Sequence, residues 1–260
     1  MVEAGAFDDI DAAMMVHPAA ADLLRMNTVA IHPLSIEYFG EAAHAAAAPE
    51  LGRNALDAAV LGYINVAALR QHITSQERVH GVFTHGGDKP NIVPHYAAQE
   101  WYVRSATAAS LQPLKERVLT CLQAGATAAG CTCSHQWSDV PYSDMIDSWP
   151  VLSAYVANAA ALGRVVHDPA QAAPVVGSTD MGNVSYVVPS IHPMIKVAPA
   201  GVSIHTPAFA GHARSAAGDQ AVLDGAKAMA MTLVDLWTDP SVLEAAAADH
   251  QAAVRARLPS

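Results

Sequence analysis

The chain has 260 residues, 52% of them hydrophobic, and a formal net charge of -10. An acidic chain without a basic run is poorly suited to nucleic acid, whose phosphates require clustered Lys and Arg. No stretch approaches the run of about 20 apolar residues that crosses a bilayer, and the start, MVEAGAFDDID, lacks the basic region of a secretory signal. We therefore expect neither a nucleic-acid nor a membrane partner.

Cysteine and histidine usage indicates the compartment and the chemistry. Three cysteines, Cys121, Cys131 and Cys133, are too few for a disulfide framework, which favours a reducing, cytoplasmic location. Thirteen histidines stand against 14 Lys plus Arg. Because histidine is the commonest metal ligand and the usual acid-base near neutral pH, this excess favours a metal enzyme.

Residues 1–33 contain one predicted strand. The apolar run at 12–16 is typical of a buried, parallel strand, and His17 follows it directly. Pro18 prevents the strand from continuing. Functional residues favour the carboxyl ends of strands in α/β proteins, although a hydrogen-bonded histidine at a strand end is an equally good interpretation.

Residues 34–145 form a predicted small domain. Hydrophobic periodicity and turn residues predict the order β-α-β-β-α-β, which is the ferredoxin-like split unit of an α+β domain. Its antiparallel sheet would carry helices on one face and leave the other face or an edge for a partner. The predicted strands are 34–44, 78–84, 95–106 and 131–140, and the predicted helices are 54–73 and 111–128.

His44 lies in the connection between the first strand and the first helix of this domain. The surrounding sequence, GEAAHAAAAPELGRNA, leaves the imidazole uncrowded among alanines. Loops that follow strands commonly display working side chains. We therefore treat His44 as a candidate catalytic residue.

Residues 146–260 contain longer helices and short apolar strands. They would join residues 1–33 in one α/β domain, into which the small domain is inserted. Two stretches, 177–185 (GSTDMGNVS) and 201–209 (GVSIHTPAF), are predicted loops. The predicted helices are 151–162, 220–237 and 242–258, and the predicted strand is 195–198.

Several polar residues are candidates for a site. His205, like His17, lies at the end of a strand and is followed closely by a proline. Both are therefore candidate metal ligands, although a zinc site requires three or four ligands. Asp180 could assist these histidines in the site, or it could be an N-cap or turn aspartate. Asn91 lies in a Gly/Pro loop, and Arg104, among aromatic residues on a strand, is either a carboxylate clamp or a snorkelling surface residue.

A C-x-C-x-H sequence occurs at residues 131–135. Cys131, Cys133 and His135 alternate along one predicted strand and therefore share a face. Their spacing differs from that of zinc fingers, and buried free thiols are the stronger interpretation.

Five motifs, taken together, resemble the dinuclear-metal amidohydrolases and exopeptidases. This family includes hippurate hydrolase, the indole-acetyl-amino-acid hydrolases and aminobenzoyl-glutamate hydrolase. The motifs occur in the family's order across nearly the whole chain: MMVHP, GEAAHAAAAPELGRNALDA, GGDKPNIVPHYA, GSTDMGNVSYVVPSIHP and SIHTPAF.

The resemblance implies a zinc-exopeptidase-type α/β domain with a ferredoxin-like lid that forms a homodimer. It implies hydrolysis of the amide bond of an N-acyl or aminobenzoyl amino acid or a dipeptide by water activated at two divalent metals, zinc, manganese or cobalt. His17 and His205 would be metal ligands, and His44 would reach the partner subunit's site and stabilise the oxyanion. Asn91 and Arg104 would hold the substrate carboxylate, and Asp180 is a further substrate-binding candidate.

The sequence departs from the family pattern in one respect. Family members carry a His-x-Cys or His-x-Asp pair and a Glu-Glu pair, and neither motif occurs here. We therefore expect the chain to correspond to the C-terminal two-thirds of the enzyme, to bind metal weakly and to have little activity by itself. A non-catalytic dimerisation or binding fragment is the alternative, and a zinc or redox protein based on Cys131 and Cys133 is a third.

Overall fold

The computed structural model describes residues 1–169 and 176–257, which fall into two compact units. One unit comprises Met1–Thr28 with Asp144–Ser260, and the other comprises Val29–Ser143. Both units combine helices with strands, as the α/β fold class requires.

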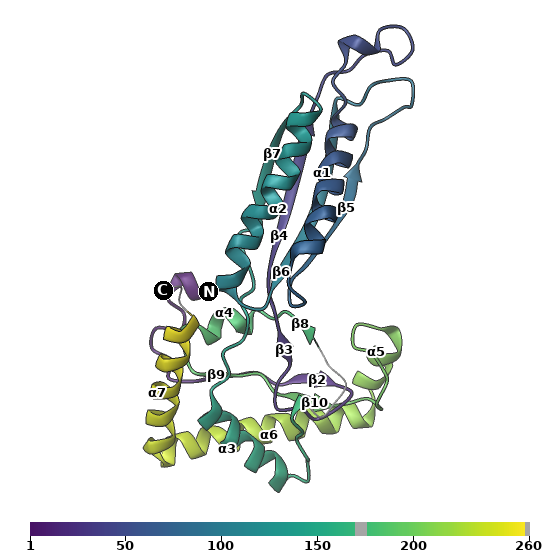
Figure 1. Ribbon diagram of the computed structural model, residues 1–260. Coiled ribbons are helices and arrows are strands. Elements are labelled where there is room, and N and C mark those ends of the chain that lie inside the picture. The colour runs from purple at the N-terminus through teal and green to yellow at the C-terminus, as the bar shows by residue number, and fades with distance from the viewer. Residues whose placement is uncertain (170–175, 258–260) are drawn as a thin grey trace. The chain divides into compact units, whose positions relative to one another are not determined.

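The unit Val29–Ser143 is built on a four-stranded antiparallel sheet with the spatial order β5-β6-β4-β7 (Figure 1). The chain order β-α-β-β-α-β and this strand order together confirm the ferredoxin-like fold. The first strand begins four residues earlier than expected and ends before His44. The elements are β4 (Ala30–Phe39), α1 (Ala55–Leu69), β5 (Arg78–His85), β6 (Tyr96–Ser105), α2 (Ala108–Ala128) and β7 (Thr132–Trp137).

Local sequence explains where the two helices of this unit begin. The Asn54 side chain accepts hydrogen bonds from the N–H groups of Leu56 and Asp57, so it caps α1. Thr107 and Ser110 cap the start of α2 reciprocally, in a capping box. At its other end α1 tightens into a 3-10 turn at Arg70–His72, within the range expected to be helical.

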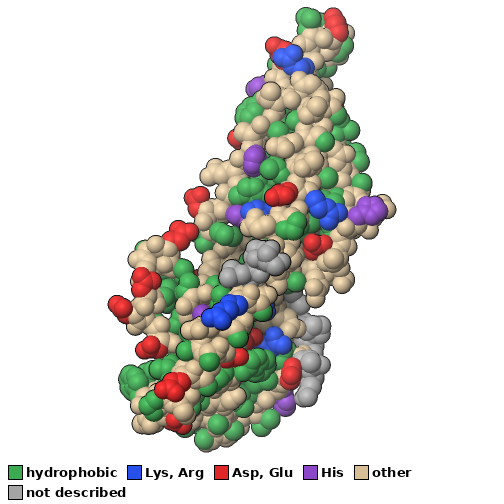
Figure 2. Space-filling model, turned by 60° about the vertical axis from the view of Figure 1, so that its left-hand side comes forward, with side chains coloured by type: hydrophobic (Ala, Val, Ile, Leu, Met, Phe, Trp, Pro, Cys, Tyr) green, Lys and Arg blue, Asp and Glu red, His purple; other side chains and the backbone are tan. Residues whose placement is uncertain are grey.

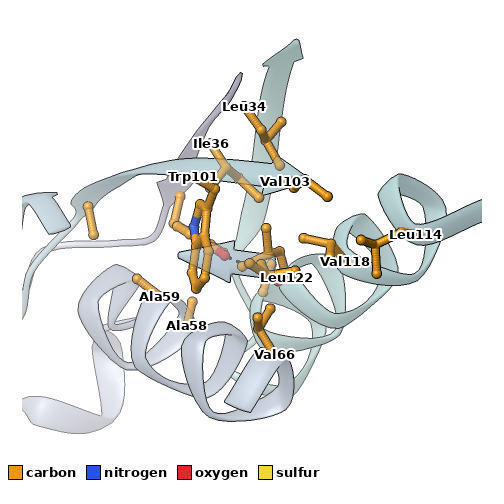
Figure 3. Close-up of a cluster of buried hydrophobic side chains, with 14 of the residues drawn as sticks. Leu34, Ile36, Ala58, Ala59, Val66, Trp101, Val103, Leu114, Val118 and Leu122 are labelled. Carbon is orange, nitrogen blue, oxygen red and sulfur yellow. Dashed lines mark hydrogen bonds between the residues drawn. The ribbon is translucent and has the colours of Figure 1, made fainter. Parts of the chain in front are cut away.

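The core of this unit lies between one face of the sheet and the two helices. Figure 3 shows side chains of β4 and β6 pointing toward those of α1 and α2. Trp101 lies at the centre and is 1% exposed. Its indole N–H donates to the buried Gln99 side chain, which in turn donates to Ala59 O, so the polar atoms of this layer are paired.

Two glycines set the spacing of α1 and α2. A Cβ atom at Gly125 would lie 2.4 Å from Ala58 O and 2.4 Å from Gly62 N. A Cβ atom at Gly62 would lie 2.7 Å from the Tyr38 hydroxyl. The contact atoms at Gly125 are backbone atoms and cannot rotate away, so the helices pack closely only because this position lacks a side chain.

We predict that Gly125→Ala lowers the free energy of unfolding by about 1–3 kcal/mol or more, because the new methyl group overpacks the helix contact. Gly211 is the matched control, since a Cβ atom there meets nothing within 4 Å. Gly211→Ala should stabilise by up to about 0.5–1 kcal/mol through helix propensity. Urea denaturation of both variants tests the pair, and equal effects would contradict the close-approach argument.

The other unit is held together by three short parallel strand pairs, each joining the N-terminal segment to a distant part of the chain. The predicted strand at 12–16 is shorter and less buried than expected, because only Ala13–Met14 pairs and both residues are partly exposed. The pairs are β1 (Ala13–Met14) with β9 (Ser190–Ile191), β2 (His17–Ala19) with β10 (Met194–Lys196), and β3 (Asn27–Thr28) with β8 (Val176–Gly177).

Helices pack around these strands, and two predicted loops contain helices. The stretch 177–185 includes α4 (Met181–Ser185), and 201–209 includes the start of α5 (Pro207–Ala213), because Thr206 caps α5 and Pro207 suits its first turn. The predicted end of the last helix, Leu258, lies outside the described residues. The three long helices are α3 (Trp149–Ala161), α6 (Ala216–Thr238) and α7 (Pro240–Arg257), which share a hydrophobic core.

A buried carboxylate, Asp147, lies just before α3. Its Oδ2 atom is 3.6 Å from Arg25 Nη1, and its side chain is 7% exposed. Burial raises the pKa of Asp147 to about 6, and the nearby Arg25 opposes this shift only in part. The folded chain therefore holds a proton that the unfolded chain releases at a lower pH.

We predict that Asp147 makes the chain less stable as the pH rises from about 4 to 6. The raised pKa favours folding while the carboxyl is protonated, and this contribution, about 3 kcal/mol, is lost as the pH passes through 6. In Asp147→Asn the difference in unfolding free energy between pH 4 and pH 7 should change by about that amount. Asp11→Asn, at an exposed position, is the control, and an unchanged pH profile in Asp147→Asn would refute the prediction.

The surface carries mixed charge. Figure 2 shows Asp and Glu side chains interspersed with Lys and Arg on the face that it draws. None of the helices in the described part of the chain combines the length and the apolar content that a membrane crossing requires.

Candidate active site

His17 begins β2, where parallel pairing with β10 fixes its backbone. Its N–H group donates to Pro193 O at 3.0 Å. Its Nδ1 atom lies 2.8 Å from Pro18 O, so Nδ1 carries the proton and donates to this carbonyl. That bond orients the ring and leaves Nε2 as an acceptor, the arrangement usual for a metal-ligating histidine.

His192 lies beside His17, and the sequence analysis missed it. The two ring centroids are 5.7 Å apart, with an interplanar angle of 62°. His192 connects β9 to β10 and is 2% exposed. A signal was present in the sequence, since His192 and Pro193 repeat the strand-end His-Pro pattern of His17 and Pro18.

The surroundings of His192 keep it neutral. Burial, together with the neighbouring His17, lowers the pKa of His192 to about 4, while Asp180 opposes this shift. Neither ring nitrogen of His192 has a hydrogen-bond partner among the described residues. A neutral imidazole with unpaired nitrogens is in the state that metal binding requires.

His205 and Asp180 are exposed, in contrast to His192. His205 has a φ of 62° and is the only non-glycine residue with a positive φ in the described part of the chain. Strained backbone of this kind is found disproportionately at functional sites. Asp180 precedes α4 at the N-cap position, but its side chain makes no capping hydrogen bond.

These residues fit part of a metal site. His17 and His192 supply imidazole nitrogens, the donors that zinc and similar metals prefer. Within residues 1–169 and 176–257, no group of three or more His, Cys, Asp or Glu side chains lies close enough to hold a metal ion. The structure brings His192 to His17 but gives no contact between His17 and His205.

His44 lies at the tip of the other unit, in a segment paired with residues 91–93. Its Nδ1 atom accepts hydrogen bonds from the N–H groups of Ala46 (3.3 Å) and Ala47 (3.2 Å). The proton of the neutral ring must therefore be on Nε2. His44 is exposed, so this N–H can donate to a ligand.

Asn91 lies at the same tip as His44, whereas Arg104 lies at the far end of β6. Asn91 O accepts from Ala45 N at 3.0 Å, and Ile92 bridges to His44. From Tyr96 to Arg104 the strand advances eight residues, or about 26 Å at about 3.3 Å per residue. Within one chain, Arg104 is therefore separated from His44 and Asn91 by nearly the length of the sheet.

Positive charge gathers around Arg104. Arg104 is directly opposite Arg78 in the register of β5 and β6, and it lies over the Tyr102 ring at 5.9 Å. The pKa of His80 is lowered first by burial and then by Arg104, Arg70 and Arg78. Because like charges in opposed positions repel, a bound anion would stabilise this end of the sheet.

The cysteines do not form a site. Cys121, Cys131 and Cys133 are free thiols packed against the core, and burial raises the pKa of each. Reactive and metal-binding cysteines require a lowered thiol pKa. The structure therefore favours unreactive thiols, and it shows all three to be partly rather than fully buried.

The chain has relatives of known activity and known structure. It is 40% identical over 245 residues to the Xaa-Arg dipeptidase of Mus musculus, covering 94% of this chain and 57% of that protein. It is 28% identical over 305 residues to one of the subunits of p-aminobenzoyl-glutamate hydrolase from Escherichia coli, covering 96% of this chain and 63% of that protein. Over nearly its whole length the chain is therefore similar to hydrolases of this kind.

A solved structure shares the fold of the chain. A dinuclear metal-binding peptidase of the M20 family from Bacillus subtilis matches with a TM-score of 0.61 and 18% identity, covering 90% of this chain and 60% of that chain. No protein-family model matches the chain. The chain thus spans a little over half the length of the mouse dipeptidase and less than two-thirds of the E. coli hydrolase.

Proposed function

We propose that the chain forms the lid and part of the metal-binding domain of an amidohydrolase that cleaves a dipeptide or an N-acyl amino acid. The observation that carries this proposal is the His17 ring, whose Nδ1 donates to Pro18 O while Nε2 is left for a metal. Homology to dipeptidases and acyl-amino-acid hydrolases supports the substrate class.

His17 and His205 are proposed ligands of a divalent metal pair, zinc, manganese or cobalt. The chemistry that such metals supply is the activation of water for attack on an amide carbonyl. His17 contributes a ring nitrogen, and its ring is held in place by the Nδ1 hydrogen bond to Pro18 O. The strained backbone at His205 supports a functional role for that residue.

His44 is the proposed donor to the negative charge that develops on the amide oxygen. Two backbone N–H groups hold its Nδ1 as an acceptor, so the Nε2 proton is directed outward before substrate arrives. Preorganised donors of this kind contribute about 10²–10³-fold to catalysis, because they need no reorganisation during the reaction.

Arg104 is proposed to bind the substrate carboxylate, and Asn91 to act with it from a different subunit. An extended dipeptide spans only about 7 Å, whereas Arg104 and the tip of the same lid are separated by about 26 Å. One ligand can therefore contact both only if they come from different chains. This separation supports a homodimer in which His44 and Asn91 serve the partner's site.

Three assignments complete the proposal: the location, one further substrate-binding residue and the alternative function. Three free thiols support a cytoplasmic location. Asp180 stays a proposed substrate-binding residue, and its effect on the pKa of His192 indicates that it lies near the two histidines. A non-catalytic dimerisation or binding fragment is the second candidate, and the lack of a three-ligand cluster among the described residues favours it.

The hydrolase proposal predicts metal-dependent release of arginine from Xaa-Arg dipeptides. The assay uses the chain alone and the chain fused to the segment of the mouse dipeptidase that it does not match. We expect little turnover by the chain alone and turnover by the fusion with zinc, manganese or cobalt. His17→Ala should reduce turnover by at least about 100-fold, because it removes a ligand. A folded fusion that takes up metal and releases no product would leave only the non-catalytic alternative.

The two-chain site predicts complementation. His44→Ala and His17→Ala fusions should each be nearly inactive, and mixing them should restore up to about a quarter of wild-type activity. A hybrid dimer contains one site with both an intact His17 and the partner's intact His44. Exposed His72→Ala is the control and should behave as wild type. Hybrids that form but show no recovery would place His44 outside the partner's site.

A further inference from the structure

We propose that His192 binds a divalent transition metal together with His17, so that the metal-binding set of this chain includes a second buried imidazole. The inference rests on the proposed function, since both assign His17 to a metal. It adds a ligand that the sequence motifs did not indicate, at the connection between β9 and β10.

The spacing of the two rings fits a shared ion. Two imidazoles that bind one zinc ion through Zn–N bonds of about 2.0–2.1 Å hold their ring centroids about 5–6 Å apart. The His17 and His192 centroids are 5.7 Å apart, and the rings are inclined at 62° rather than stacked. His17 already uses Nδ1 for Pro18 O, so its Nε2 is the nitrogen that would bind.

The backbone around the pair is fixed without a metal. Met15 N donates to Ile191 O at 3.1 Å, and His17 N donates to Pro193 O at 3.0 Å. These two hydrogen bonds flank His192 on one strand, and the second is made by His17 itself on the other. Binding would therefore require little ordering of the chain, which is the condition for a preorganised site.

The burial of His192 needs an explanation that packing does not supply. A buried polar group without a hydrogen-bond partner destabilises the fold, and both ring nitrogens of His192 lack a partner among the described residues. A phenyl ring would fill the same space without this cost. A metal ligand explains the choice of imidazole at this position.

Replacement of His192 by Phe separates the two explanations. His192→Phe keeps the ring and its contact with His17 but removes both nitrogens. If His192 only packs, the variant should bind metal as wild type does. If His192 is a ligand, the variant should fold with equal or higher thermal stability and lose metal affinity.

The experiment titrates the 260-residue chain with cobalt(II) and follows visible absorption and bound metal. We expect His192→Phe and His17→Ala each to weaken cobalt binding at least 10-fold and to alter the spectrum, while His72→Ala does neither. In parallel, zinc added to ¹⁵N-histidine-labelled wild type should shift the ring nitrogens of His17 and His192 together. This measurement needs no variant to fold.

Three results would overturn the inference. They are wild-type cobalt affinity and spectrum in His192→Phe, zinc-induced shifts confined to His17, and no metal binding by the unmodified chain. Loss of binding in His17→Ala with retention in His192→Phe would remove only His192 and leave the proposed function standing. Loss of cobalt binding in both variants, with no turnover by the fusion protein, would support metal binding by His17 and His192 and refute the hydrolase function.

Discussion

The parallel pairing of residues 13–19 with residues 190–196 is the constraint on which the candidate site depends. These strands are only two or three residues long, and they join segments separated by more than 170 positions. The pairing places His17 beside His192 and leaves the two rings inclined to each other. The Arg164 side chain reinforces it, because its guanidinium binds Asp22 and Asp224 and donates to Lys196 O.

The unit Val29–Ser143 depends on a different constraint. Two glycines let α1 and α2 pack closely on one face of the sheet, so the opposite face and the tip stay available. At the tip, a turn of small residues fixes the tautomer of His44 through two backbone N–H groups. The alanines around His44 therefore matter because their backbones approach the ring and their side chains do not cover it.

Much of the unit Val29–Ser143 could be predicted from sequence because its signals are local. Helical periodicity, the Asn54 and Thr107 caps and the Gly/Pro loop determine its elements within a few residues. The helix α5 was missed although Thr206 and Pro207 are a local start signal. His192 was missed for another reason, since its partner is distant in sequence and only strand pairing reveals it. The distance of about 26 Å between Arg104 and the tip of this unit likewise follows from β6 being one unbroken strand.

Anomalous X-ray scattering from crystals of the chain grown with zinc tests the central claim most directly. The account predicts an anomalous peak at zinc–nitrogen bonding distance, about 2.0–2.1 Å, from Nε2 of His17 and from a ring nitrogen of His192. It also predicts that the His17 Nδ1 bond to Pro18 O is retained. Zinc bound elsewhere, with no density between the two histidines, would contradict the account.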